Sequence, residues 1–222
     1  MGIADQIIRI KAELGEGIRL VAVSKTRPAE DLLEAYRAGQ RIFGENKVQE
    51  LTGKHGLLPE DVEWHFIGHL QTNKVRFIAP FISLIHSVDS FKLLRTIDRE
   101  GRKNKRRISC LLQFHIAREE SKYGFSMTEA REMFASADFA ALEHVDICGV
   151  MGMATNTFDQ ELVRAEFREL KSIFGKIKQD FFGRQNSFSE ISMGMSGDYP
   201  LAVEEGSTLV RVGSLIFGER KP

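Results

Sequence analysis

The stretch Leu20–Thr26, which reads LVAVSKT, decides the fold class of this chain. It is a short β-branched run that ends in a polar turn, and it lacks the Gly-x-Gly-x-x-Gly loop of a dinucleotide-binding open sheet. Further along, similar short runs alternate with helix-like segments, which is typical of βα units and a parallel sheet. The predicted strands are Leu20–Ser24, Arg41–Phe43, Trp64–Ile67, Leu84–His86, Ile108–Phe114, Val145–Val150, Glu190–Ser192 and Leu209–Val212.

Eight βα units in 222 residues predict an α/β fold: a compact, single (β/α)8 TIM barrel, somewhat shorter than the roughly 250 residues typical of that fold. An amphipathic segment around Ile3–Leu14 precedes the first run and predicts an extra N-terminal helix. No linker or low-complexity segment divides the chain, so we expect one domain over residues 1–222. A doubly wound open sheet is the alternative.

Charge and hydropathy exclude several classes of partner. The 31 Lys and Arg residues balance the 31 Asp and Glu residues, so no net field draws the chain to nucleic acid or an anionic membrane. The basic run Arg102–Arg107 is interpreted as a solvated face at the bottom of the barrel. No apolar stretch approaches the roughly 18 residues of a spanning helix. The start, Met1–Gln6, lacks the features of a signal peptide, and we expect a cytoplasmic protein.

The two cysteines, Cys110 and Cys148, lie in apolar strand-like runs. Neither has a second Cys or a His at metal-ligand spacing. We therefore expect buried thiols, with no disulfide and no metal site.

The first predicted strand carries a candidate reactive group. Alternation places Val21, Val23 and Lys25 on one face, which should be the barrel interior, so Lys25 should project into the mouth where barrel chemistry gathers. A lysine that ends an apolar strand is often only a snorkelling residue. In a partly desolvated pocket, however, the pKa of the ammonium falls and the amine can form a Schiff base with an aldehyde. Pyridoxal 5′-phosphate (PLP) is the natural aldehyde partner.

Two late segments, Ser192–Asp198 and Arg211–Ser214, supply a candidate phosphate site. Loops after the seventh and eighth strands often bind phosphate in such barrels, through glycine backbone N–H groups and serine hydroxyls. Ordinary turn chemistry is the alternative. Arg211 should share the inward face with Leu209 and face the pyridine nitrogen, where it would disfavour protonation of that nitrogen. An internal salt bridge to a carboxylate is the other interpretation of Arg211.

Several motifs in order resemble the pyridoxal phosphate homeostasis protein family, and the match runs over nearly the whole chain. They are Val23–Thr26 (VSKT), Phe43–Glu50 (FGENKVQE), Trp64–Lys74 (WHFIGHLQTNK), Glu120–Gly124 (ESKYG), Ser192–Ser196 (SMGMS) and Arg211–Gly218 (RVGSLIFG).

The resemblance implies a barrel like the N-terminal domain of alanine racemase (PLP fold type III), with PLP linked to Lys25. It implies phosphate contacts at Ser196, Gly213 and Ser214, with Arg211 near the pyridine nitrogen and Asn46 in the pocket. Together with the strand-end analysis, the expected cofactor-binding residues are Lys25, Asn46, His65, Met151, Ser192, Met195, Ser196, Arg211, Gly213 and Ser214.

Some positions depart from the family pattern or stay open. His115 stands where the family commonly has asparagine, and Gly152 where a threonine-like residue is expected.

His65 and His69 flank the end of the third strand, one inside and one in the loop, and with Gln71 and Asn73 they form either a polar rim or helix caps. The methionines at 151, 153, 193 and 195 are interpreted as deformable packing beside the ring.

A racemase needs a second base on the opposite face of the substrate. In the related racemases this base is a tyrosine of a separate domain of a partner subunit, whereas this chain stops four residues after Gly218. Of Tyr36, Tyr123 and Tyr199, Tyr199 is the least poor substitute, with packing as its stronger interpretation.

We therefore expect a PLP carrier in intracellular PLP homeostasis, buffering or delivering the cofactor, with no catalytic residues and no robust catalysis. Amino acids would assist release, apo-enzymes would be transient partners, and the protein would be a monomer. The alternatives are a small PLP-dependent amino-acid racemase and a protein-interaction module without a ligand.

Overall fold

The computed structural model describes residues 2–118, 123–183 and 186–219. Eight parallel strands close into a barrel in the order β1 to β8, so the predicted (β/α)8 barrel is confirmed and the open sheet is wrong. The strands are β1 (Arg19–Val23), β2 (Ile42–Glu45), β3 (Glu63–Phe66), β4 (Leu84–Val88), β5 (Ile108–Gln113), β6 (Val145–Met151), β7 (Glu190–Met195) and β8 (Leu209–Val212).

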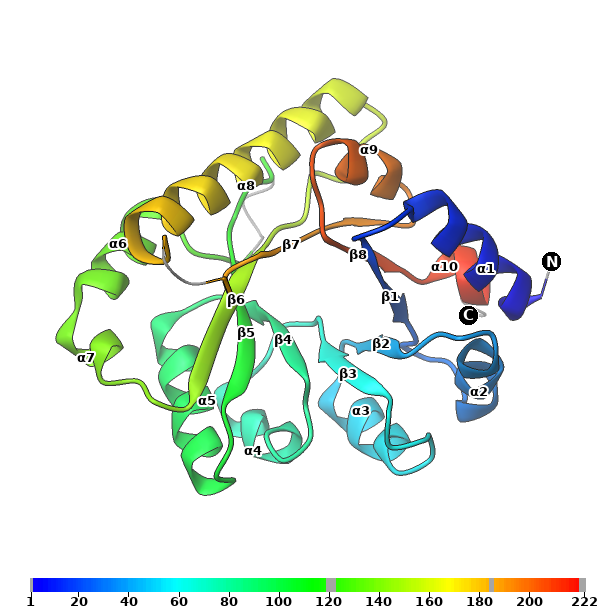
Figure 1. The fold of residues 1–222 in the computed structure, drawn as a ribbon, viewed down its shortest axis with the longest axis horizontal. Helices are drawn as coiled ribbons and strands as arrows, with labels where there is room; N and C mark the ends of the chain where they lie inside the picture. Colours follow the sequence, from blue (N-terminus) through cyan, green and yellow to red (C-terminus); the bar gives the residue numbers. More distant parts are fainter. Residues whose placement is uncertain (1, 119–122, 184–185, 220–222) are drawn as a thin grey trace.

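Helices surround the barrel, and both ends of the chain lie on the same side of it, beside α1 and α10 (Figure 1). The N-terminal helix has the predicted bounds. The helical elements are α1 (Ile3–Leu14), α2 (Ala29–Arg37), α3 (Val48–His55), η1 (Thr72–Lys74), α4 (Val75–Ile78), α5 (Phe91–Lys103), α6 (Met127–Ala135), α7 (Ala137–Ala140), α8 (Gln160–Phe181), α9 (Tyr199–Glu204) and α10 (Ser214–Phe217).

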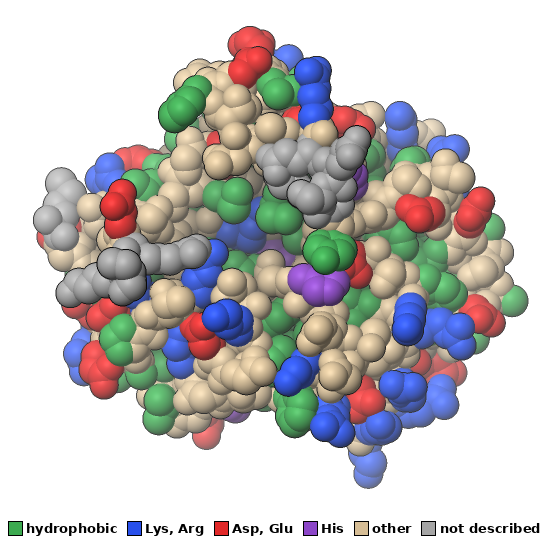
Figure 2. Space-filling model, turned by 180° about the vertical axis from the view of Figure 1, so that it is seen from behind, with side chains coloured by type: hydrophobic (Ala, Val, Ile, Leu, Met, Phe, Trp, Pro, Cys, Tyr) green, Lys and Arg blue, Asp and Glu red, His purple; other side chains and the backbone are tan. Residues whose placement is uncertain are grey.

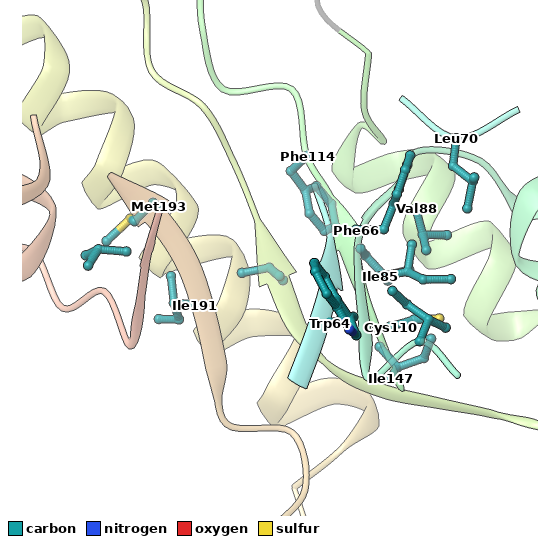
Figure 3. Packing of buried hydrophobic residues seen from close by; sticks show 14 of the residues in the cluster. Trp64, Phe66, Leu70, Ile85, Val88, Cys110, Phe114, Ile147, Ile191 and Met193 are labelled. Atoms are coloured by element: carbon teal, nitrogen blue, oxygen red, sulfur yellow. The ribbon is translucent and has the colours of Figure 1, made fainter. Parts of the chain in front are cut away.

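Strand alternation divides the buried apolar residues into two layers. The large outer cluster fills the space between strands and helices, and Figure 3 shows Trp64, Phe66 and Ile85 packed together within it. Each such side chain contributes about 1.5–3 kcal/mol when fully buried. A small inner cluster lies within the barrel and consists of Val21, Ile42, Leu84, Leu111, Met151 and Leu209. The inner cluster forms a floor on which the residues nearer the strand ends rest.

Three strands, β2, β4 and β7, extend at least two residues further than the hydrophobic pattern predicts. β4 runs to Val88, two residues beyond His86. β2 continues through Gly44 to Glu45, because the carboxylate of Glu45 is buried against Lys54 and Ser24 and does not turn out to solvent. β7 continues to Met195 through Gly194, whose φ of 91° is in the left-handed region, and its pairing with β8 shifts register there. All three extensions carry residues toward the same end of the barrel.

The cysteines are free thiols. Cys110 is buried, whereas Cys148 is only half-buried, so the expectation of two buried thiols is corrected at Cys148. The reason is that Cys148 packs against the small inner cluster, whereas Cys110 belongs to the thick outer one. Within the described ranges, no group of three or more His, Cys, Asp or Glu side chains could hold a metal ion. None of the helices in those ranges has the length and apolar content needed to cross a bilayer.

Candidate functional site

A cavity of about 450 Å³ lies at the carboxyl ends of the strands. Its volume is in the range of small-molecule sites. Figure 2 shows a hollow near the centre of one face, with His, Lys or Arg, and hydrophobic side chains around it. The described residues that line the cavity are Val23, Lys25, Arg27, Asn46, Ile67, Gly68, His69, Gln113, Tyr123, Met153, Met195, Ser196, Gly197, Arg211, Gly213, Ser214, Phe217 and Gly218.

The first strand delivers Lys25 to this cavity. Val21 belongs to the inner cluster, Val23 lines the cavity, and Lys25 follows two residues later, also in the lining. This is the face that period-2 alternation assigns to the three residues. Lys25 is half-buried and lines the cavity.

The loops after β7 and β8 meet at another wall of the cavity. The backbone N–H of Gly213 donates a hydrogen bond to Ser196 Oγ over 3.2 Å, which ties the two loops together. A side chain at Gly213 would bring its Cβ to 3.1 Å from the Val23 carbonyl oxygen, a tight contact that shows how closely β8 approaches β1 here. The wall thus presents the hydroxyls of Ser196 and Ser214 and the backbone of Gly197, a donor set suited to an anion.

Arg211 lies at the floor of the cavity and is 4% exposed. Its Nη1 donates to Ser192 Oγ over 2.6 Å and its Nη2 donates to the Gly152 carbonyl over 3.1 Å. Burial lowers the pKa of Arg211 to about 10, and Asp198 acts in the opposite direction. The guanidinium therefore stays charged at neutral pH. Its described hydrogen-bond partners are neutral, which fits an inward-facing cation better than a structural salt bridge.

A chain of buried polar groups continues below Arg211. Ser192 Oγ lies 2.8 Å from His86 Nδ1, and His86 Nε2 lies 2.9 Å from His65 Nδ1. Burial lowers the pKa of His65 to about 3, and burial with the neighbouring His65 lowers that of His86 well below its usual value. Both imidazoles are therefore neutral at physiological pH. Three of the expected cofactor-binding residues do not line the cavity: His65, Met151 and Ser192. His65 and Ser192 belong to the hydrogen-bonded polar groups beneath Arg211, and Met151 lies in the inner cluster.

This histidine pair predicts a loss of stability in acid. The unfolded chain takes up a proton at each histidine near pH 6.5. In the native state His65 takes up its proton only near pH 3, and the pKa of His86 also lies well below its usual value. The folded state therefore has its full stability above pH 6.5. It loses free energy of unfolding as the pH falls from 6.5 toward the native-state pKa values. At pH 5 the neutral His65 alone costs about 2 kcal/mol of stability, and His86 adds a loss in the same direction.

Urea unfolding at pH 7.5 and pH 5 measures this effect. We expect the free energy of unfolding of His86→Gln to differ less between the two pH values than that of the wild type. The control His144→Gln changes a half-buried histidine that is not part of the Ser192–His86–His65 group, and it should keep the wild-type difference. Equal pH dependence in all three proteins would contradict the neutral buried pair.

Asn46 carries an unused acceptor. Its Oδ1 is buried in the cavity wall, and no donor in the described part of the chain bonds to it. A Cβ at Gly68 would lie 2.3 Å from the backbone oxygen of Asn46, so glycine is needed for these two strand ends to approach. A buried acceptor without a donor costs about 1–3 kcal/mol. A ligand with a hydrogen-bond donor would recover that cost.

An aromatic pair stands at the rim. The rings of His69 and Tyr123 stack with centroids 4.3 Å apart, and His69 Nδ1 lies 3.0 Å from Asp89 Oδ2. Gln113 Nε2 donates to the Tyr123 carbonyl over 2.7 Å and holds this segment against the end of β5. The sequence analysis missed Gln113, although alternation from the inward Leu111 points to it. Glu120–Lys122 of the ESKYG motif lie outside the described residues.

Several open positions are now placed. His115 is exposed and is absent from the cavity lining. A Cβ at Gly152 would lie 2.7 Å from Ile116 Cδ1, so this position is filled by packing. Gln71 precedes η1 without a side-chain cap.

The tyrosines are placed as well. Tyr199 is buried with its hydroxyl on Glu13, and burial raises the pKa of Tyr199 to about 12, so the packing interpretation holds. Tyr36 bonds Asp61 over 2.7 Å, and Tyr123 is the tyrosine of the described cavity lining.

The fold and the cavity define a (β/α)8-barrel protein with a small-molecule site at the carboxyl ends of its strands. A family model described as "Alanine racemase, N-terminal domain" matches residues 2–221, and the chain belongs to this family. Within it, the similar curated proteins are named "Pyridoxal phosphate homeostasis protein". The one from Aquifex aeolicus is 37% identical over 204 residues, which are 91% of this chain and 87% of the relative. The one from Vibrio alginolyticus is 38% identical over 211 residues, 92% of this chain and 88% of the relative.

Solved structures agree with this assignment. PipY of Synechococcus elongatus, whose structure was solved with PLP bound, has a TM-score of 0.88 and 36% identity, covering 97% of this chain and 100% of PipY. Alanine racemase from Bartonella henselae has a TM-score of 0.71 at 17% identity and covers 99% of this chain but 61% of the racemase. The racemase likeness therefore shows the shared barrel alone.

Proposed function

We propose that this chain is a cytoplasmic, monomeric protein that binds PLP as a Schiff base on Lys25 and acts in intracellular PLP homeostasis, by buffering or delivery, without robust catalysis. One observation carries the proposal: Lys25 lines the same cavity as the Ser196, Gly213 and Ser214 wall and the buried Arg211. The relatives named as PLP homeostasis proteins, and PipY with PLP bound, support it.

The residues present fit the cofactor. The hydroxyls of Ser196 and Ser214 and the backbone of Gly197 are donors suited to its phosphate, and Arg211 is a cation suited to the pyridine nitrogen. The unused acceptor of Asn46 fits the ring hydroxyl. When bound, PLP supplies an aldehyde that combines reversibly with amines. Lys25 then holds the cofactor, while the serine wall and Arg211 orient it.

The geometry at the rim favours a carrier over an enzyme. The residue Tyr123 is 59% exposed, and the side chain of His69 is 46% exposed, so the described lining leaves the mouth open to water. Carbanion chemistry benefits from water exclusion, whereas release of an aldehyde to an amino acid or an apo-enzyme needs access.

The test is a transfer assay with the loaded protein. We expect an apo-PLP-enzyme to regain activity when mixed with it, faster when a free amino acid is present to displace Lys25. A free amino acid in deuterated water should exchange its α-hydrogen no faster than with PLP alone. No transfer at all would contradict the delivery part of the proposal.

The racemase alternative has one observation in its favour, Tyr123 in the cavity lining. Steady α-hydrogen exchange or conversion between enantiomers, lost in both Lys25→Ala and Tyr123→Phe, would establish that alternative. Failure to retain PLP under saturating conditions would instead favour an interaction module without a ligand.

A further inference from the structure

A buried charged cluster lies beneath the turn that carries Lys25. Glu45, at the end of β2, has no exposed surface, and its Oε1 accepts hydrogen bonds from Lys54 Nζ over 2.7 Å and from Ser24 Oγ over 2.6 Å. Lys54, from α3, also donates to the Ser24 carbonyl over 2.8 Å. The residue before Lys25 is therefore held at both its hydroxyl and its carbonyl.

The residue after Lys25 is held by the same helix. Glu50 lies one turn before Lys54 in α3, and its Oε2 accepts the backbone N–H of Thr26 over 2.6 Å. The same oxygen lies 3.5 Å from Lys54 Nζ, so the two contacts form one connected cluster. Thr26 has a φ of 64°, a left-handed conformation that a β-branched residue seldom adopts without support. Glu50 supplies that support by bonding the N–H of the strained residue.

Stability alone is a poor explanation for this cluster. A buried ion pair is often no more stabilising than apolar residues of the same volume, because both charges lose their hydration. Burial raises the pKa of Glu45, and the hydrogen bonds from Lys54 and Ser24 oppose that rise. Glu45 Oε2 is buried with no partner in the described part of the molecule. Such a group costs free energy that a purely structural contact would avoid.

We propose that Glu45, Glu50 and Lys54 are positioning residues, a Lys25 clamp that fixes the Ser24–Thr26 turn and thereby sets the rate and extent of Schiff-base formation at Lys25. The inference rests on the proposed function, because it assigns three further residues to the same site. None of the three lines the cavity, and they contact this turn at Ser24 and Thr26, the residues on either side of Lys25.

The step that the clamp assists is an addition followed by dehydration. The neutral Lys25 amine attacks the aldehyde carbon, a C–N bond forms, and the C=O bond is replaced by C=N. The aldehyde oxygen leaves as water with the two protons lost from the nitrogen, and no oxidant or reductant takes part. Because the amine must meet the carbon along a narrow approach, a turn that samples other conformations lowers the rate.

The first test compares two carboxylates that accept backbone N–H groups, the half-buried Glu50 and the buried Asp98. Glu50→Ala removes the acceptor of Thr26. Its matched control, Asp98→Ala, removes the acceptor of the Glu143 and His144 N–H groups at the opposite end of the barrel. After PLP is added, stopped-flow absorbance gives the rate of Schiff-base formation, and borohydride reduction with peptide mapping gives its extent at Lys25. We expect Glu50→Ala to slow formation at least 10-fold and Glu50→Gln to recover most of the rate, while Asp98→Ala forms the Schiff base at the wild-type rate.

A double variant, Glu45→Met with Lys54→Met, separates positioning from stability. It removes the buried pair together, so we expect a urea midpoint no lower than that of the wild type, yet slower Schiff-base formation. This variant decides the matter if Glu50→Ala does not fold. Wild-type rates in the double variant, or equal slowing by Glu50→Ala and Asp98→Ala, would overturn the clamp. If the wild-type protein itself forms no Schiff base on Lys25, the proposed function fails, a result distinct from either of these.

Discussion

Replacing Lys25 by alanine is expected to abolish covalent PLP binding and to weaken PLP affinity at least 100-fold, which corresponds to about 2.7 kcal/mol. Of the described residues that line the cavity, Lys25 is the only one with a primary amine. Arg27 and Arg211 carry guanidinium groups, which are too weakly nucleophilic to take its place. Only reversible contacts at the serine wall and the cavity floor would remain.

Equilibrium dialysis and visible absorbance measure this change. The matched control is Lys92→Ala, which removes an exposed amine of α5 that does not line the cavity and should leave binding unchanged. A Lys25→Ala protein that keeps the wild-type affinity and absorbance would show that Lys25 is a structural strand-end residue. The proposed carrier mechanism would then have to be abandoned.

Removal of the ligand's phosphate should have the second large effect. Pyridoxal has the aldehyde and the ring of PLP but not the phosphate, and we expect it to bind at least 100-fold more weakly. The wall formed by Ser196, Gly213 and Ser214 would lose two or more hydrogen bonds to a charged group, each worth about 1.5–3 kcal/mol. Competition dialysis of pyridoxal against PLP measures the ratio.

Serine variants show whether the loss arises at this wall. Ser196→Ala and Ser214→Ala should weaken PLP binding several-fold and leave pyridoxal binding almost unchanged. Ser172→Ala, an exposed change on α8, should alter neither. If pyridoxal and PLP bind equally in the wild type, the loops after β7 and β8 do not hold a phosphate.

Local sequence patterns predicted most of the fold, because the hydrophobic periodicity of each strand and helix is visible within its own βα unit. The run at Leu20–Ser24, the preceding amphipathic helix and the placement of Lys25 on the inward face all follow from period-2 or period-3.6 spacing. The strand ends were harder to predict, and a buried polar group explains the end of β2. The pattern treats Glu45 as a loop residue, whereas its buried contacts with Lys54 and Ser24 explain why the strand continues.

The site was harder to predict, because it depends on depth within the barrel as well as on facing inward. Met151 and Met153 lie two residues apart, yet Met151 is in the inner cluster and Met153 lines the cavity. Ser192 lies below Arg211, whose side chain reaches down to bond it, and His65 lies deeper still. The stagger between neighbouring strands determines which of the inward-facing residues line the cavity. That stagger cannot be deduced from a single sequence.

The central claim is that Lys25 holds PLP covalently, and reductive trapping tests it most directly. The protein is saturated with PLP, reduced with borohydride, digested, and analysed by peptide mass spectrometry. The account predicts a pyridoxyl group on Lys25 in nearly every molecule, and none on that peptide without PLP. A label on another lysine, or no label despite saturation, would contradict the account.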